Sequence, residues 1–511
     1  MESKSPLIRS FAFICERVSG QVSADFLLKN GFGYRRVTCI GQVGTGSILR
    51  AFEYGADRVV LFGCLEQECR HEIGAQNARK QVEMSRQILK LMGFNPGQVQ
   101  FVTVSGPVSF DDLFVRTAGV KEKFLNKQPV NSEQEFGDKD FEKVVKQSDF
   151  VCIDCGRCSG VCPVARTGLG FSPRRLLQKA LTENTVVNTR VIYACLGCDM
   201  CKTVCPTGKS IAEEMLRLRA LAFQEGTQPV LAHDGVVQTL GRMMAKTALI
   251  QNRRDWVGAE LRVVDKGETA LWTGCAPYFD VLFKELGVNP VETLRNAVRI
   301  MNRLGIEPVV LSDERCCGHD LLWMGDVRTV RKLARHNLDR LQDAGVKEVV
   351  FLCPECLRTF KLDYPRIAGT RLLGLRLRHI SEFLLEHGFK PIGNGKRLRV
   401  TYHDPCRLSR HLGVEDAPRQ LITEVNGVEL VEMEHNRTEA LCCGGTSWLE
   451  CGAAVRLLQD RRLQEWQAVN AETLITGCSR CEIHLRCAQL SRGNKDALRI
   501  VNLIDFISDK E

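Results

Sequence analysis

Cysteines dominate the chemistry available to this sequence. The 511-residue chain contains 24 of them, and 22 fall into groups with the spacing of metal ligands. Two groups repeat one pattern, in which three cysteines separated by two residues are followed, after three more, by a cysteine and a proline. The copies are Cys152, Cys155, Cys158, Cys162 and Pro163, and Cys195, Cys198, Cys201, Cys205 and Pro206. Three thiolates so spaced wrap one face of an iron–sulfur cubane, and the fourth points to a neighbouring cluster.

The two copies therefore predict two [4Fe–4S] cubanes with exchanged fourth ligands, as in bacterial ferredoxins. Structural zinc is the alternative, but zinc needs only four ligands per site and has no use for a paired eight-cysteine layout. The expected ligand sets are Cys152, Cys155, Cys158 and Cys205 for one cubane, and Cys195, Cys198, Cys201 and Cys162 for the other.

The remaining composition indicates a metal protein in a reducing compartment. Tight cysteine groups in a large chain favour metal over disulfides. Residues Met1 to Cys15 carry charges and no sustained apolar stretch, so we expect no secretory signal and a cytoplasmic, soluble protein. No window approaches the roughly 20 apolar residues of a membrane span. The net charge of +9 is dispersed, which favours a solvated surface over a docking face for an acidic redox partner, and argues against nucleic-acid binding.

The first hundred residues alternate short apolar runs with helical patterns, which predicts a parallel α/β domain. The runs are Phe11 to Cys15, Val37 to Ile40, Val59 to Cys64 and Val99 to Val104, and the longest helical pattern is Glu72 to Met92.

Four cysteines of this segment should meet at one sheet edge. Cys15, Cys39 and Cys64 lie at or near the carboxyl ends of runs, where α/β sheets bind ligands, and Cys69 shares a loop with Cys64. Four convergent thiolates suit a [2Fe–2S] cluster. Gly41, Gly44 and Gly46 do not have the dinucleotide-binding spacing, so we expect them to let backbone N–H groups approach cluster sulfur rather than to bind a nucleotide or flavin.

The first 110 residues or so resemble the delta subunit of methyl-viologen-reducing hydrogenase. The similarity rests on Cys39 after Val37 and Thr38, on the segment Ala51 to Asp57, and on Gly63-Cys64 followed by Cys69. It implies that Cys15, Cys39, Cys64 and Cys69 are the [2Fe–2S] ligands.

The last part of the chain contains an internal repeat. In each half, apolar runs and helical patterns alternate and deliver one, two and two cysteines to a common edge. Helical patterns occupy Val291 to Leu304, Val327 to Leu341 and Gly452 to Trp466. The cysteines are Cys275, Cys316, Cys317, Cys353 and Cys356 in the first half, and Cys406, Cys442, Cys443, Cys478 and Cys481 in the second.

This repeat resembles a double copy of the cysteine-rich CCG domain found in the B and D subunits of heterodisulfide reductase. The resemblance implies that each five-cysteine set holds a noncubane [4Fe–4S] cluster and that the ten cysteines form the catalytic terminus. Zinc or an ordinary cluster in one of the sets is the alternative.

Residues around these sets could support chemistry, although a structural role is favoured for each. His319, His403 and His484 are candidate proton donors, but hydrogen-bond partners of sulfur or ordinary loop residues are the simpler reading. Arg407, Arg410 and His411 could bind an anion, but a solvated helix face is favoured. Cys451 and Cys487 match no pattern, and we expect unliganded core cysteines.

The fold class predicted is α/β and α, in three domains. They are a parallel α/β domain at 1–120, a helical two-cluster ferredoxin domain at 140–250 and a duplicated α/β CCG domain at 268–508, with a hydrophilic linker at Lys121 to Asp140.

Together the resemblances imply a protein like the D subunit of heterodisulfide reductase, equivalent to fused C and B subunits, with the delta-like domain in front. The protein would be part of a multi-subunit complex. Its electron donor would be a hydrogenase, a formate dehydrogenase or a flavin-bifurcating partner such as a flavoprotein like the A subunit of heterodisulfide reductase. The electrons would reduce a disulfide at the pair of noncubane clusters. The alternative is a non-catalytic conduit to another reductase or to a quinone site.

Overall fold

The computed structural model describes residues 10–105, 152–182, 189–246, 249–367, 374–393, 395–445, 447–449, 451–493 and 499–508. The chain divides into two compact units. The first comprises Met1–Gln134 and Ala232–Arg253, and the second comprises Glu135–Leu231 and Arg254–Glu511. The predicted linker at 121–140 lies outside the described residues.

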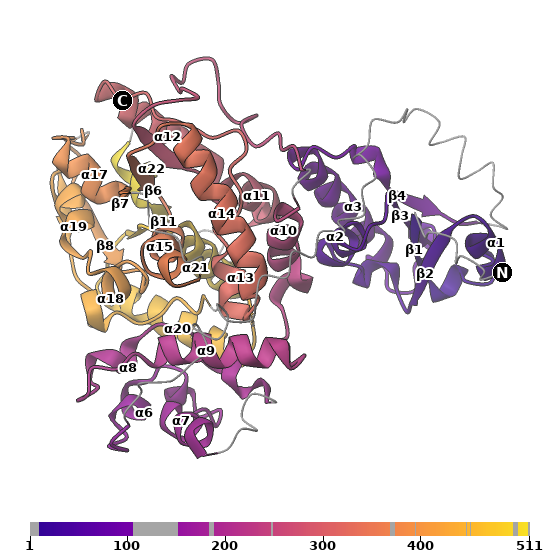
Figure 1. The fold of residues 1–511 in the computed structure, drawn as a ribbon, viewed down its shortest axis with the longest axis horizontal. Helices are drawn as coiled ribbons and strands as arrows, with labels where there is room; N and C mark the ends of the chain where they lie inside the picture. The colour runs from indigo at the N-terminus through magenta and orange to yellow at the C-terminus, as the bar shows by residue number, and fades with distance from the viewer. Residues whose placement is uncertain are drawn as a thin grey trace. The chain divides into compact units, whose positions relative to one another are not determined.

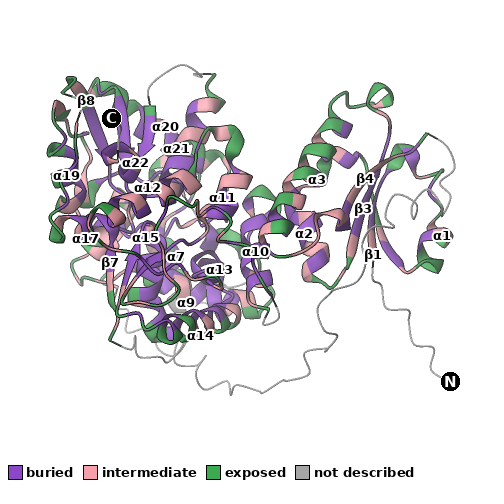
Figure 2. Ribbon diagram, turned by 90° about the horizontal axis from the view of Figure 1, so that it is seen from above, coloured by how far each residue is buried: buried purple, intermediate pink, exposed green. Residues whose placement is uncertain are grey.

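The first unit is built on a four-stranded parallel sheet with the order β2-β1-β3-β4. Figure 2 shows that its central strands are buried, while α3 has one buried and one exposed face. The predicted parallel α/β fold is therefore confirmed. The elements are β1 (Ser10–Cys15), α1 (Ala24–Lys29), β2 (Phe32–Val37), α2 (Thr45–Glu53), β3 (Arg58–Gly63), α3 (Gly74–Leu91) and β4 (Val99–Thr103).

A segment from much later in the chain completes this unit. Helix α10 (Val236–Met244) packs against α2, as Figure 1 shows. The Arg242 guanidinium donates to both carboxylate oxygens of Glu53, at 2.5 and 3.1 Å, and Lys246 donates to the Glu53 carbonyl at 2.6 Å. This ion pair is mostly shielded from solvent, so it fastens the returning segment to the first unit.

The second unit begins with a helical part that carries the two repeated cysteine motifs. Its helices are short except for α9, whose N-terminus is capped by the Ser210 hydroxyl. They are α6 (Arg157–Val161), α7 (Pro173–Thr182), α8 (Met200–Thr203) and α9 (Ile211–Gln224).

The rest of the second unit consists of two α/β halves. The first half has the parallel sheet β5-β6-β7, and the second has the parallel sheet β11-β10-β8-β9. Residues 308–311 do not form a strand, and Val309 makes only isolated bridges to Val264 and Ala270. The strands are β5 (Thr269–Trp272), β6 (Glu348–Phe351), β7 (Arg376–His379), β8 (Leu398–His403), β9 (Val428–Leu430), β10 (Thr473–Thr476) and β11 (Arg499–Asn502).

Helices cover these sheets, and one hydrophobic core joins the halves. Leu271, Val350, Val400 and Ile475, one from each of β5, β6, β8 and β10, belong to the same buried cluster. The helices are α11 (Ala276–Leu282), α12 (Pro290–Arg303), α13 (His319–Met324), α14 (Val327–Asp343), α15 (Pro354–Arg358), α16 (Tyr364–Ile367), α17 (Ile380–Glu386), α18 (Ser409–Leu412), α19 (Asp416–Thr423), α20 (Ala453–Ala468), α21 (Ser479–Ser491) and α22 (Leu503–Ile507).

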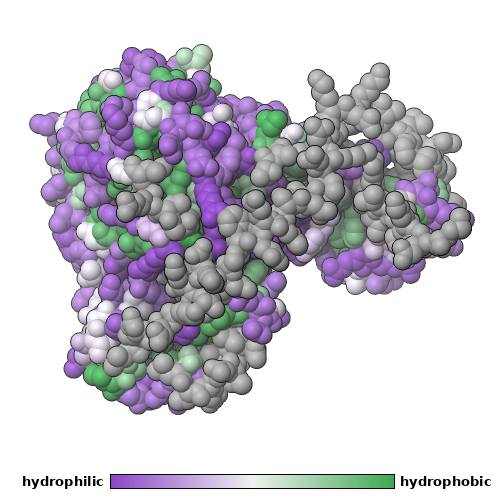
Figure 3. All heavy atoms as spheres, viewed as in Figure 1, coloured by the Kyte–Doolittle hydropathy of each residue, from purple (hydrophilic) through white to green (hydrophobic). Residues whose placement is uncertain are grey.

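The described surface is mixed in polarity. On the face drawn in Figure 3, hydrophilic side chains are spread over the coloured surface with smaller hydrophobic areas between them. Among the described helices, none combines the length and the apolar character needed to cross a membrane.

Candidate metal centres

Four thiols converge at the carboxyl edge of the first sheet. Cys15 is the last residue of β1, Cys64 follows β3 directly and Cys39 follows β2 by two residues. Cys69 is hydrogen-bonded to both Cys39 and Cys64. Burial acts to raise the pKa of Cys69, but hydrogen bonds from the backbone N–H groups of His71, Ala75 and Gly74, together with one from Cys64, outweigh it and lower that pKa. These N–H groups would stabilise a thiolate in the same way.

The glycines of this edge fall into two groups. As expected, the backbone N–H of Gly41 donates to the Cys39 sulfur, but Gly44 and Gly46 act differently. A Cβ on Gly46 would overlap the backbone of Asp234, and the side chain of Asp234 accepts a hydrogen bond from the Ser47 N–H, at 2.5 Å. Gly44 and Gly46 therefore leave room for the segment around Asp234, whose side-chain carboxylate caps the N-terminus of α2. Gly74 also lies close to sulfur, since a Cβ there would be 2.5 Å from the Cys39 sulfur.

The two repeated motifs exchange their fourth cysteines in space. One cavity is lined by Cys152, Cys155, Cys158 and Cys205, which are three cysteines of the first motif and the last of the second. A second cavity is lined by Cys162, Cys195, Cys198 and Cys201. The folded chain thus brings together the two groups of four expected from the spacing.

Left-handed turns direct backbone N–H groups at these sulfurs. Asp154 and Gly156 in the first motif, and Gly197 and Asp199 in the second, all have positive φ. As a result the Asp154 N–H donates to the Cys152 sulfur and the Gly197 N–H donates to the Cys195 sulfur, each at 3.4 Å. Such donors stabilise negative charge on sulfur.

The ten cysteines of the duplicated halves form one continuous series of sulfur contacts. In the first half the series runs from Cys275 to Cys316, Cys317, Cys356 and Cys353, with 3.3 Å between the sulfurs of Cys317 and Cys356. In the second half it runs from Cys406 to Cys442, Cys443, Cys481 and Cys478, with 3.3 Å between Cys443 and Cys481.

The two halves of the series meet at Cys353 and Cys478. Hydrogen bonds from Cys356 and then Cys478 hold the pKa of Cys353 well below its usual range. Likewise, hydrogen bonds from Cys316 and Cys356 lower the pKa of Cys317 to about 7. Both shifts favour the thiolate form, which is the form that ligates metal.

The far end of the series approaches the helical part of the unit. Cys198 lies close enough to Cys406 and Cys442 for their charges to interact. The second five-cysteine set therefore lies between the Cys162–Cys201 cavity and the first set.

An ion cluster that the sequence did not reveal joins the two halves. Arg480, two residues after Cys478, donates to Asp320 at 2.6 and 2.9 Å and pairs with Glu355 at 2.8 Å. All three side chains are buried, and they line a cavity with Cys275, Cys317, Cys353 and Cys356. Since Asp320 and Arg480 are 160 residues apart, no local pattern could have signalled the pair.

The expected solvated face at Arg407, Arg410 and His411 is wrong. Arg410 donates to the Cys198 carbonyl at 2.6 Å, and both Arg407 and His411 donate to the Gly197 carbonyl. Arg407 also stacks on the buried Trp323 ring, at 4.1 Å. These side chains dock the loop of the second motif onto the duplicated halves.

The three singled-out histidines are all buried beside the cysteine sets. The Nδ1 atom of His319 is 3.0 Å from the Thr359 hydroxyl, and His484 stacks on Trp448. His403 accepts a hydrogen bond from Arg462. The expectation for Cys451 and Cys487 is wrong, because Cys451 is exposed and Cys487 is half-buried.

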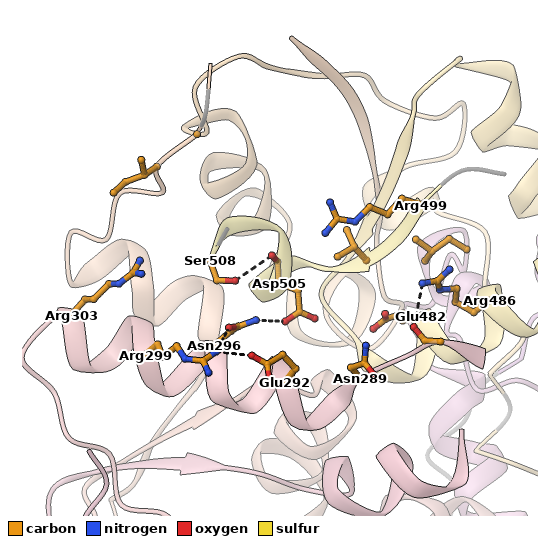
Figure 4. Close-up of a pocket in the computed structure, with 15 residues that line it drawn as sticks. Asn289, Glu292, Asn296, Arg299, Arg303, Glu482, Arg486, Arg499, Asp505 and Ser508 are labelled. Carbon is orange, nitrogen blue, oxygen red and sulfur yellow. Dashed lines mark hydrogen bonds and ion pairs between the residues drawn. The ribbon is translucent and has the colours of Figure 1, made fainter. Parts of the chain in front are cut away.

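A groove of about 950 Å³ lies away from the thiols. Figure 4 shows hydrogen-bonded pairs among its lining side chains, with Arg299 donating to Glu292 and Asn296 donating to Asp505. Since none of the described residues that line it is a cysteine, it is not a candidate redox site.

The donor sets fit iron–sulfur groups. All 24 cysteines are free of disulfides, and 22 are gathered into the sets above. Soft thiolate ligands, backbone N–H groups aimed at sulfur and burial are the conditions under which proteins hold such clusters.

Comparison with known proteins supports this chemistry. Three family models match: "Methyl-viologen-reducing hydrogenase, delta subunit" over residues 11–113, "4Fe-4S dicluster domain" over 150–209, and "Cysteine-rich domain" over 269–361 and 400–486.

Individual relatives cover parts of the chain. The D subunit of dihydromethanophenazine:CoB--CoM heterodisulfide reductase from Methanosarcina barkeri is 32% identical over 276 residues, which are 51% of this chain and 63% of the relative. EtfAB:quinone oxidoreductase of Syntrophomonas wolfei is 30% identical over 42% of this chain and 30% of its own length. The B subunit of fumarate reductase (CoM/CoB) from Methanothermobacter marburgensis is 27% identical over 57% and 55%. The chain thus spans less than two thirds of each relative, and the predicted resemblance to the heterodisulfide reductase D subunit is confirmed.

Proposed function

From the premise that this chain is an iron–sulfur protein similar to the D subunit of heterodisulfide reductase, we propose that it is an oxidoreductase subunit that reduces a disulfide. The observation that carries the proposal is the unbroken series of ten thiols. One end of the series lies close to Cys198, and the two halves are joined by the contact between Cys353 and Cys478. A disulfide needs two electrons and two protons to become two thiols. Two adjacent redox sites could supply the electrons one at a time.

The proposed cofactors are one [2Fe–2S] cluster, two [4Fe–4S] cubanes and two noncubane [4Fe–4S] clusters, on the cysteine sets described above. When bound, these groups supply one-electron transfer. The chain's own residues hold them: thiolates ligate, backbone N–H groups neutralise charge on sulfur, and Arg407 and Arg410 keep the second motif against the duplicated halves. The inventory amounts to about 18 iron atoms per chain. Anaerobic iron analysis tests it, and stoichiometric zinc in the last part of the chain would contradict it.

Electron entry is proposed at the first unit. Its resemblance to a hydrogenase delta subunit favours a hydrogenase, formate dehydrogenase or flavoprotein partner within a multi-subunit complex. Cys39→Ser should block reduction by the natural partner, while small artificial dyes should still reduce the later clusters. Reduction by the partner at the normal rate would place entry elsewhere.

The catalytic step is tested with the anaerobically purified chain, reduced by a dye and given a small disulfide. Cys317→Ser and Cys443→Ser should abolish thiol formation while the cubane EPR signals persist. With the right disulfide, the half-reduced wild type should give a new paramagnetic signal.

The similarity to EtfAB:quinone oxidoreductase favours a second candidate, a non-catalytic conduit to a quinone site. If no disulfide perturbs the duplicated halves while the assembled complex still passes electrons to another acceptor, this second function replaces the first.

A further inference from the structure

A buried N–H group occupies the same position in both duplicated halves. Trp272 ends β5 three residues before Cys275, and His403 ends β8 three residues before Cys406. Trp272 is 2% exposed and His403 is 1% exposed. In the described part of the chain, neither the indole Nε1 nor the imidazole Nε2 has a hydrogen-bond partner. Because buried donors are rarely left unpaired, each position requires an acceptor.

The proton on His403 is placed by Arg462. The Nε–H of Arg462 lies 2.9 Å from Nδ1 of His403, and a guanidinium can only donate. Arg462 is itself fixed, since it is fully buried and donates to the His435 carbonyl at 2.7 Å and to Glu465 at 2.6 Å. Nδ1 is therefore an acceptor, and the ring carries its hydrogen on Nε2.

The acceptor available to His403 is sulfur. One of its ring nitrogens lies within 4.8 Å of the sulfurs of Cys443 and Cys481. Since Nδ1 is bonded to Arg462, Nε2 is the nitrogen left to face the cysteine set. A nitrogen that carries a proton cannot ligate metal, but it can donate to a thiolate or to a bound sulfide.

We infer that His403 is a positioning residue that donates an Nε2–H hydrogen bond to sulfur in the second cysteine set and thereby raises the reduction potential there. The inference rests on the proposed function in one respect, the assignment of this set as an iron–sulfur site. Reduction adds negative charge, which a donor to sulfur stabilises, so hydrogen bonds of this kind help to set cluster potentials.

The first half offers a weaker version of the same contact. A Cβ on Gly274 would lie 3.3 Å from the Cys356 sulfur and 4.0 Å from Trp272 Nε1, so the indole N–H and this sulfur border the same small space. The indole has no second nitrogen that could accept a hydrogen bond from a cation, whereas Arg462 polarises the His403 ring through Nδ1.

Charged side chains lie beside both sets: Asp320 and Arg480 flank the first, and Arg410 lies near Cys406 and Cys442 of the second. Because Arg462 polarises the donor that faces the second set, we expect that set to accept an electron at a higher potential than the first.

The test is an anaerobic redox titration of the full-length, iron-loaded chain, followed by EPR and visible absorbance. Cys275→Ser and Cys406→Ser assign the signals to the two sets. His403→Phe should shift the midpoint of the second set to a more negative potential without loss of iron. His403→Gln retains an N–H donor and should shift it less. Trp272→Phe is the matched control and should move the first set alone.

Two results would overturn the inference. The first is an unchanged midpoint potential in His403→Phe. The second is loss of iron from the second set in His403→Phe while Trp272→Phe keeps its iron, which would make His403 a ligand. If His403→Phe fails to fold, Arg462→Met provides the same test, since the unpolarised ring should also give a more negative midpoint. No substrate enters the titration, so a chain that shows these shifts but reduces no disulfide contradicts the proposed function alone.

Discussion

Cys353 is the residue through which the two five-cysteine sets touch. Its sulfur accepts hydrogen bonds from Cys356 in its own half and from Cys478 in the other. Cys275 lies at the opposite end of the series and is hydrogen-bonded to Cys316 alone among the cysteines. Cys353 therefore contacts a cysteine of the second set and Cys275 does not, although both belong to the first set.

This difference gives the first prediction. Cys275→Ser should remove iron from the first set and leave the EPR signal of the second unchanged. Cys353→Ser should remove the same iron and also alter the line shape of the second set, because its contact with Cys478 is lost. Identical spectra for the second set in both variants would show that the halves are independent.

A second prediction at the residue scale concerns Arg480. Arg480→Met leaves the carboxylates of Asp320 and Glu355 buried without their cation, which should lower the free energy of unfolding by about 3 kcal/mol. Arg366→Met removes an exposed pair with Glu213 and should cost less than about 1 kcal/mol. Denaturant unfolding monitored by tryptophan fluorescence compares them, and equal effects would contradict the assigned role.

At the scale of elements, the loop between Cys195 and Cys201 is fitted onto α13. A Cβ on Gly197 would overlap the ring of Trp323. The guanidinium groups of Arg219 and Arg407 make cation–π contacts with the same ring. Arg219 in turn donates to the carbonyls of Ile192 and Cys195, so the loop is held from both sides.

A pair of glycine substitutions isolates this fit. Gly197 and Gly208 both have positive φ, at 62° and 65°, and alanine at either should cost about 1–2 kcal/mol from the backbone alone. Gly208 has nothing within 4 Å of its Cβ position, whereas Gly197 meets Trp323. Gly197→Ala should therefore also slow electron transfer from the dicluster segment to the duplicated halves, measured by stopped-flow absorbance, and Gly208→Ala should not.

The sequence predicted elements well where the signal was local. The helical patterns near Val291 and Val327 became α12 and α14, and the cysteine spacing predicted which thiols share a cavity. The chemistry of thiolate ligands fixes that spacing, so a short stretch of sequence is enough to reveal it.

What the sequence could not predict depends on distant partners. Arg410 and Cys198 are 212 residues apart, and the arginine therefore looked like part of a solvated helix face. Gly46 looked like a glycine for cluster sulfur, because the Asp234 segment that fills its space lies 188 positions later. Pairing of this kind is decided by packing of the whole unit, which no local pattern encodes.

At the scale of the whole molecule, the first unit is assembled from two separated stretches of chain. The Asp234 carboxylate caps α2, and Arg242 pairs with Glu53. The predicted first domain, 1–120, does not contain this second stretch, so the proposed boundary leaves out residues that pack with the unit.

The fourth prediction follows. Gly46→Ala should push the Asp234 backbone away and release α10, seen as faster amide hydrogen exchange over residues 236–244. Gly20→Ala, with nothing near its Cβ position, should leave this exchange unchanged. Slow exchange in Gly46→Ala would mean that α10 is held independently of the cap.

The discontinuous first unit has a consequence for biosynthesis. Its four thiols are synthesised within the first 69 residues, but the stretch that completes the packing around α2 ends at residue 253. At roughly 5–20 residues per second, the ribosome needs on the order of ten to forty seconds to make that intervening chain. During that interval α2 lacks both its carboxylate cap and the helix that packs against it. The first unit therefore completes its fold only after the segment up to residue 253 has been made.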